Sequence, residues 1–171
     1  CERGPLNGVL NSVFRLNALN GVGRADYTIQ DMRPDVDRPL FSSVFNDWTV
    51  PLEIVSGEIQ VQGRYRWWRT ATGLPRENLS ADVQLQNIGG HYEGMLFSGL
   101  TYQDSIELLP QFRSRGDAAR LSIADIDIGI AISDFASGLR FLPSPLGPLP
   151  LLKVDELQMR LLDGMLTGER L

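Results

Sequence analysis

Apolar and polar residues alternate along much of this chain, and that pattern leaves few folds open to it. Between positions 58 and 67 the apolar residues Ile59, Val61, Tyr65 and Trp67 are interleaved with Glu58, Gln60, Gln62, Arg64 and Arg66. A β-strand places alternate side chains on opposite faces, whereas a helix would scatter these polar residues around its circumference. Residues 58–67 are therefore predicted to form a strand with one apolar face and one wet face.

The same alternation returns in four later segments. Their apolar rows are Leu79, Ala81, Val83 and Leu85; Met95 and Phe97; Ala124, Ile126, Ile128, Ile130 and Ile132; and Leu157, Met159 and Leu161. The residues Asn87-Ile88-Gly89-Gly90 tolerate positive φ and predict a tight reversal, followed by a strand from Tyr92 to Leu100. The last row could also belong to a short helix, but the Asp163-Gly164 pair after it favours a hairpin.

The remaining segments give weaker signals. Residues 9–19 fit either a short strand pair broken at Asn11 or an irregular helix, and residues 28–33 fit a strand that Pro34 ends. Residues 35–48 predict a loop or a short helical turn, and residues 113–117 and 143–150 predict loops. Eight to ten strands joined by hairpins, without a βαβ rhythm, indicate one all-β unit over residues 1–171: an antiparallel meander with few or no long helices. The abrupt ends of the sequence suggest an excerpt from a longer protein.

Composition excludes several functional classes. With 43% hydrophobic and 22% charged residues, the chain of 171 residues is expected to fold. Its net charge is -5 and no Lys/Arg cluster stands out in the sequence, which argues against nucleic acid as a partner. The most apolar stretch, residues 141–152, is too short and too rich in proline to cross a bilayer. Cys1 is the only cysteine, so it is either a lipidation site or a boundary of the excerpt.

The residues available for catalysis are few. His91 is the only histidine, which excludes a multi-histidine metal site, and it is expected to make surface hydrogen bonds in a turn after Gly90. Asp125 and Asp127 could form a carboxylate pair on one strand face, although a solvated face is the favoured interpretation. No GxSxG motif is present to position a nucleophilic serine. The sequence therefore predicts a protein that is not an enzyme and that has no cofactor or metal.

Two sets of side chains could bind a ligand. Arg64, Arg66 and Arg69 line one side of a strand and could hold an anion, or they could simply be solvated. Tyr65, Trp67 and Trp68 could be core residues, or they could line an apolar groove or lie where a chain meets a lipid headgroup. Both aromatic interpretations require a face that avoids water, so they stay open at this point.

The order of these segments resembles a known family. The run from Ile54 to Trp67, the stretch Leu79-Ser-Ala-Asp-Val-Gln-Leu-Gln-Asn-Ile-Gly-Gly-His-Tyr-Glu-Gly, the segment 127–132 and the segment 157–164 are similar to the C-terminal region of the YdbH-like family. This family also carries the label "dicarboxylate transport" and falls within the AsmA-like envelope proteins. The family often has Gly-Gly in the last hairpin, where this sequence has Asp163-Gly164.

The resemblance implies a long, curled, taco-shaped β-sheet in the periplasm of a Gram-negative cell, in a parent protein anchored in the inner membrane. It implies that phospholipids pass along a hydrophobic gutter toward the outer membrane, and that a small outer-membrane lipoprotein pairs with the C-terminal end by β-strand addition. The dicarboxylate label would require an anion pocket, for which Arg64 and Arg66 are the candidates.

The residues expected to line the gutter and contact phospholipid acyl chains are the apolar rows: Ile59, Val61, Tyr65, Trp67, Leu79, Val83, Leu85, Met95, Phe97, Ile126, Ile128, Ile130, Ile132, Leu157, Met159 and Leu161. Two alternatives remain. One is a closed β-sandwich or barrel that seals Trp67 and Ile128 in its core, and the other is an enzyme that uses Asp125 and Asp127.

Overall fold

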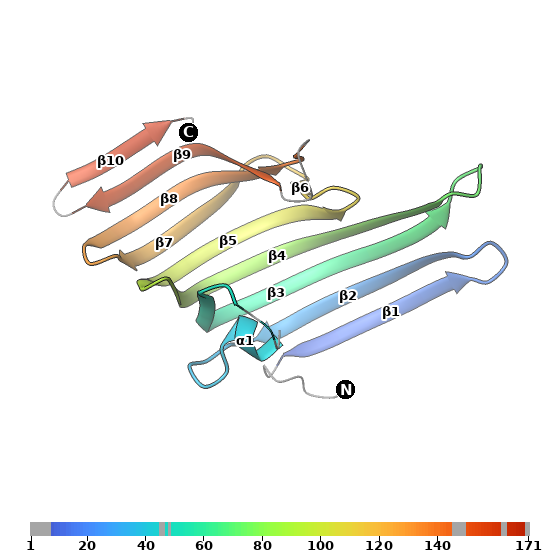
Figure 1. Cartoon of the computed structure of the whole chain (residues 1–171), viewed down its shortest axis with the longest axis horizontal. Coiled ribbons are helices and arrows are strands. Elements are labelled where there is room, and N and C mark those ends of the chain that lie inside the picture. The colour runs from blue at the N-terminus through green and yellow to red at the C-terminus, as the bar shows by residue number, and fades with distance from the viewer. Residues whose placement is uncertain (1–7, 45–46, 48, 145–149, 162–163, 170–171) are drawn as a thin grey trace.

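The computed structural model (Figure 1) describes residues 8–44, 47, 49–144, 150–161 and 164–169. These residues form one ten-stranded sheet in which every pairing is antiparallel. The strands are β1 (Val9–Asn17), β2 (Val22–Met32), β3 (Leu52–Arg69), β4 (Pro75–Tyr92), β5 (Met95–Leu109), β6 (Arg113–Ser114), β7 (Ala119–Asp127), β8 (Ala131–Leu142), β9 (Leu151–Leu161) and β10 (Gly164–Glu169). The predicted all-β antiparallel meander is confirmed.

The sheet is open. Its strands follow the chain order from β1 at one edge to β10 at the other, with the two-residue β6 attached to β5 beside the path. Among the described residues β1 pairs only with β2, and β10 only with β9. The closed sandwich or barrel considered from the sequence is therefore wrong, because the alternation reflects one amphipathic layer and not two apolar faces packed together.

Only one layer is present in the described part of the chain, so the buried core is small. The buried hydrophobic residues there are Ala25, Ile59, Ala81, Ile88 and Ala119. The short helix α1 (Leu40–Val44) lies at one end of β3, and the Glu53 carboxylate accepts hydrogen bonds from the Phe41 and Ser42 amides at 3.1 and 2.8 Å. This helix is the helical turn predicted within residues 35–48; Phe45 and Trp48 lie outside the described residues.

The first hairpin is more regular than the sequence suggested. Residues 9–17 form a single strand that continues through Asn11, and β2 starts before the segment expected as a strand. Neither the broken strand pair nor the irregular helix is correct for this segment. Nine consecutive register pairs between β1 and β2 account for the regularity, because each strand satisfies the backbone groups of the other.

The reversal predicted at residues 87–90 is wrong. Strand β4 continues through these residues to Tyr92, and the chain turns at Glu93-Gly94, where φ is 46° and 86°. Asn87 has a φ of 52° and lies in a bulge. A Cβ on Gly90 would lie 2.1 Å from the Glu53 carbonyl oxygen. Glycine here allows a close approach to β3, so the Gly-Gly pair marks a bulge rather than a turn.

The apolar row Ala124–Ile132 is also not one strand. Strand β7 ends at Asp127 and β8 begins at Ala131, so Ile128 and Ile130 lie in the turn between them, 57% and 53% exposed. Gly129 has a φ of 86°, and its amide donates to Asp127 Oδ1 at 2.8 Å. An alternating sequence can form either one long strand or two strands joined by a tight turn. Here the positive φ of Gly129 and the hydrogen bond to Asp127 favour the turn.

The C-terminal prediction is confirmed as strand, since residues 151–161 form β9 and pair with β10 in an antiparallel hairpin. Asp163 of the predicted turn lies outside the described residues, as do residues 145–149 of the predicted proline-rich loop. The loop predicted at 113–117 starts with the two residues of β6.

Candidate functional site

The strand register gathers the apolar rows onto one side of the sheet, here called the apolar face. Directly paired residues of neighbouring strands project to the same side. One unbroken line of such pairs crosses the sheet from β2 to β9: Met32, Ile59, Leu85, Tyr102, Leu121, Ser137 and Leu157. Two rows that lie far apart in the sequence, around Ile59 and around Leu157, therefore belong to the same face.

Further pairs extend the apolar face in both directions. Toward the β3–β4 turn it carries Val61 beside Val83 and Tyr65 beside Leu79. At the other end of the strands a second line pairs Phe97, Ile126, Ile132 and Leu161. Of the sixteen residues predicted to line a gutter, fourteen lie on this face. The exceptions are Ile128 and Ile130, which occupy the β7–β8 turn.

No second layer among the described residues covers the apolar face. Most of its side chains are half-buried by their neighbours within the sheet, and only Ile59 among the predicted residues is buried. Toward the β1 edge the face is more open, since Leu10, Phe14 and Leu16 are 63%, 72% and 66% exposed. A contiguous apolar surface of this kind is unusual on a soluble monomer and marks a place where something else binds.

Aromatic rings occupy one end of the apolar face. The rings of Tyr65 and Trp67 lie 5.4 Å apart, and the Trp67 ring covers Gly23 of β2, where a Cβ would come within 1.9 Å of it. The ring of Tyr27 covers Gly63 of β3 in the same way. Together with Phe14, the rings of Tyr65 and Trp67 border a hollow of about 890 Å³. Trp68 differs from the prediction, because it projects to the opposite, polar face and is 38% exposed.

One polar cluster interrupts the apolar face beside β6. The Asp104 carboxylate is 7% exposed and accepts hydrogen bonds from the Tyr102 hydroxyl at 2.9 Å and from the Ser114 hydroxyl at 2.6 Å. The Ser114 oxygen in turn accepts the Phe141 amide at 3.0 Å. Burial, together with the bond to the Asp104 carboxylate, raises the pKa of Tyr102. The cluster ties β6 to β5 and β8, and no spacing in the sequence pointed to it.

The polar face holds Arg64 and Arg66, two of the three arginines considered for an anion. The prediction that Arg69 shares their side of the strand is wrong, because Arg69 has the parity of Tyr65 and Trp67 and projects to the opposite side. Arg64 Nε donates to Asp26 Oδ1 at 2.9 Å, and Arg24 Nε approaches the other oxygen at 2.6 Å. The guanidinium groups of Arg24 and then Arg64 beside this carboxylate lower the pKa of Asp26 to about 2. Arg69 instead donates to the Gly73 carbonyl in the β3–β4 turn. The three predicted arginines therefore do not converge on one pocket, and Arg64 already has an acidic partner.

The residues considered for catalysis are dispersed. Asp125 is exposed, with the Ser98 hydroxyl 3.4 Å from its carboxylate, while Asp127 serves the β7–β8 turn. His91 lies within β4, opposite Glu53 and Leu96, and not in the predicted turn. Within the described ranges no three His, Cys, Asp or Glu side chains are grouped so as to hold a metal ion.

These features define a class of protein: a single-layer, open, amphipathic β-sheet whose apolar face has no covering layer among the described residues. The model of the YdbH-like family, described as intermembrane phospholipid transport protein YdbH, matches residues 9–171. The chain belongs to the YdbH-like family, which confirms the resemblance seen in the sequence. No curated protein and no solved structure matches it. Within the described part of the chain, no helix has the length and apolar character needed to cross a membrane.

Proposed function

We propose that the apolar face shields the acyl chains of phospholipids while they pass between the inner and outer membranes. The observation that carries this proposal is the line of paired side chains from Ile59 to Leu157, which crosses the sheet and has no covering layer among the described residues. The membership of a family described by intermembrane phospholipid transport supports the choice of ligand.

The energetics favour such a surface. Each acyl CH₂ left in water costs about 0.8 kcal/mol, so a phospholipid with two uncovered chains would face a cost on the order of 20 kcal/mol. Outside the Asp104 cluster, the apolar face removes much of this cost along its length. A lipid that moves along the face exchanges one apolar neighbour for another, and no chemical step is needed. We accordingly propose that the chain acts as a conduit and not as an enzyme.

The open sheet also suggests how the chain is placed in the envelope. Its edge strands β1 and β10 each have one side without a neighbouring strand in the described sheet, and such edges can accept a further strand. We propose that the segment forms part of a periplasmic bridge in an inner-membrane-anchored parent protein, and that a small outer-membrane lipoprotein adds strands to it.

Two neighbouring residues of β3 allow a direct test. Val61 is half-buried on the apolar face, whereas the next residue, Gln62, is exposed on the polar face. A photo-crosslinking amino acid is placed at either position in the full-length protein in living cells, and lipid adducts are detected by mass spectrometry. We expect phospholipid adducts at position 61 and few at position 62. Equal yields at the two positions, or none at position 61, would refute the proposal.

A further inference from the structure

One end of the sheet carries a concentration of arginines that was not apparent in the sequence. The segments 15–26 and 64–77, which belong to the β1–β2 and β3–β4 hairpins, contain six arginines and two acids, Asp26 and Glu77, although the whole chain has a net charge of -5. Register places Arg15 opposite Arg24, and Arg24 opposite Arg66. Like charges directly opposite each other across strands are destabilising, so this row is unfavourable unless an anion is bound near it.

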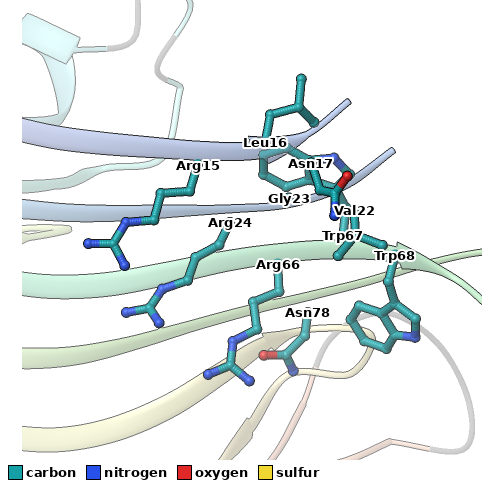
Figure 2. Close-up of a pocket in the computed structure, with 10 residues that line it drawn as sticks. All are labelled: Arg15, Leu16, Asn17, Val22, Gly23, Arg24, Arg66, Trp67, Trp68 and Asn78. Atoms are coloured by element: carbon teal, nitrogen blue, oxygen red, sulfur yellow. The ribbon is translucent and has the colours of Figure 1, made fainter. Parts of the chain in front are cut away.

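The available acids neutralise only part of this charge. Asp26 pairs with Arg24 and Arg64, but no described residue forms an ion pair with Arg15 or Arg66. Figure 2 shows the side chains of Arg15, Arg24 and Arg66 extending side by side from three neighbouring strands. With Trp68 and Asn78 they border a hollow of about 850 Å³ on the polar face.

The hairpin turns beyond this row expose apolar side chains. Both turns project from the same end of the sheet, away from α1 (Figure 1). Leu19 in the β1–β2 turn is 99% exposed, and Leu74 at the end of the β3–β4 turn is 58% exposed. Within the turns, the Leu19 amide donates to Asn17 Oδ1 at 3.0 Å and the Leu74 amide donates to Thr70 Oγ1 at 3.1 Å. Satisfied amides lower the cost of moving these turns out of water.

We propose that this end of the sheet, here called the hairpin end, docks on the surface of a bilayer that contains anionic phospholipids. Leu19 and Leu74 enter the boundary of the hydrocarbon, and Arg15, Arg24 and Arg66 contact the phosphates. Trp68 lies between them, in the zone where indole rings concentrate in membrane proteins.

The dimensions are consistent with this placement. Arg15 lies two positions before the end of β1 at Asn17, which corresponds to about 7 Å along a strand. The headgroup region of one leaflet is roughly 5–8 Å thick. Arg15 therefore matches the depth of the phosphates when the leucines are at the acyl boundary. Arg66 lies three residues before the end of β3, about 10 Å along the strand, and its long side chain can extend toward the phosphates. The inference goes beyond the proposed function, because it does not require the apolar face to hold a lipid.

Vesicle co-sedimentation tests the docking. The chain is mixed with vesicles that contain phosphatidylglycerol or with vesicles of phosphatidylcholine alone. We expect tighter binding to the anionic vesicles, and weaker binding when NaCl is raised to about 0.5 M because salt screens the arginines. Each arginine near an anionic surface contributes about fivefold in affinity, so the double variant Arg15→Gln/Arg66→Gln is expected to bind about 25-fold more weakly.

The hairpin tips have a separate variant and a matched control. Leu19→Ser/Leu74→Ser is expected to lose about tenfold or more with both kinds of vesicle, because it removes the inserted side chains. The control Arg120→Gln/Val36→Ser changes an exposed arginine and a valine that is 78% exposed, both away from the hairpin end, and should bind like the unaltered chain. Circular dichroism verifies that all three variants keep the sheet.

Three outcomes would overturn the inference. They are equal binding to both kinds of vesicle, an effect of the control as large as that of the arginine variant, and complete displacement by free inorganic phosphate, which would indicate a soluble anion as the ligand. Binding that neither the arginine nor the leucine variant weakens would also contradict the inference, because the vesicle would then contact another part of the chain. Photo-crosslinking at position 61 remains an independent readout of the proposed function, so failure of one proposal does not imply failure of the other.

Discussion

Ile88 was predicted to lie in a turn and Ile128 in the middle of a strand, yet the structure gives them the opposite environments. Ile88 has no exposed surface and lies against β3, where a Cβ on Gly57 would come within 2.7 Å of its Cδ1. Ile128 lies in the β7–β8 turn and is 57% exposed. Substitution of each by alanine removes three carbon atoms, so any difference in the effect reports on packing alone.

The magnitude follows from burial. Removal of three buried carbons costs about 2.4 kcal/mol in transfer free energy, and the cavity left beside Gly57 adds to this, for a total of about 3 kcal/mol for Ile88→Ala. Ile128→Ala should change the free energy of unfolding by less than about 0.5 kcal/mol. Urea denaturation followed by circular dichroism measures both. With a denaturant slope of about 2 kcal/mol per molar, the midpoint of Ile88→Ala should fall by about 1.5 M.

The comparison has a clear negative outcome. Equal destabilisation by the two substitutions would mean that Ile128 packs in a continuous row, as its sequence pattern alone suggested. The β7–β8 turn would then be wrong, and with it the register that places Ile126 beside Ile132 on the apolar face.

Three further predictions concern the polar cluster around Asp104, the glycine that the Trp67 ring covers, and Asp26 on the polar face. Ser114→Ala leaves Asp104 with one donor fewer and should lower the free energy of unfolding by about 1–3 kcal/mol, measured by urea denaturation. Gly23→Ala forces the Trp67 ring away from β2 and should alter the near-ultraviolet circular dichroism, whereas a change only in unfolding temperature would contradict the ring position. Because folding lowers the pKa of Asp26 from 3.8 to about 2, its stabilising effect is present above about pH 4 and is lost as the pH falls toward 2. The difference in urea midpoint between the unaltered chain and Asp26→Asn should therefore shrink over that range, and a constant difference would refute the ion pairs.

The alternation in the sequence was sufficient to predict the strands, their antiparallel order and most of the apolar face. For residues 58–67 the prediction holds at every position. The neighbouring strand β4 alternates in the same way, and a shift in register by one residue would move every apolar side chain to the polar face. The same reasoning failed at Asn87–Gly90 and at Ile128–Ile130. In both places residues tolerant of positive φ could mark either a bulge or a turn, and contacts with another strand decide which.

Features that depend on register could not be predicted from one sequence. Arg66 is far from Arg15 and Arg24 in the chain, and the three become neighbours only when β1, β2 and β3 are aligned. The hydrogen bonds of Asp104 arise in the same way, since β6 folds back beside β5. Trp68 was grouped with its aromatic neighbour Trp67, although consecutive residues of a strand must face opposite sides.

The linear order of the strands has a consequence for how cooperatively the protein unfolds. Apart from the small contacts of α1 with β3 and of β6 with β8, the extensive contacts of each strand in the described part of the chain are with the strands beside it in the sheet. Stability is then a sum of nearest-neighbour terms, as in repeat proteins, and no central core forces all strands to unfold together. Hydrogen exchange should be fastest in the outermost ribbons and slowest near the long β3–β4 pair. A hairpin added to or removed from either edge would widen or narrow the sheet without repacking its central strands.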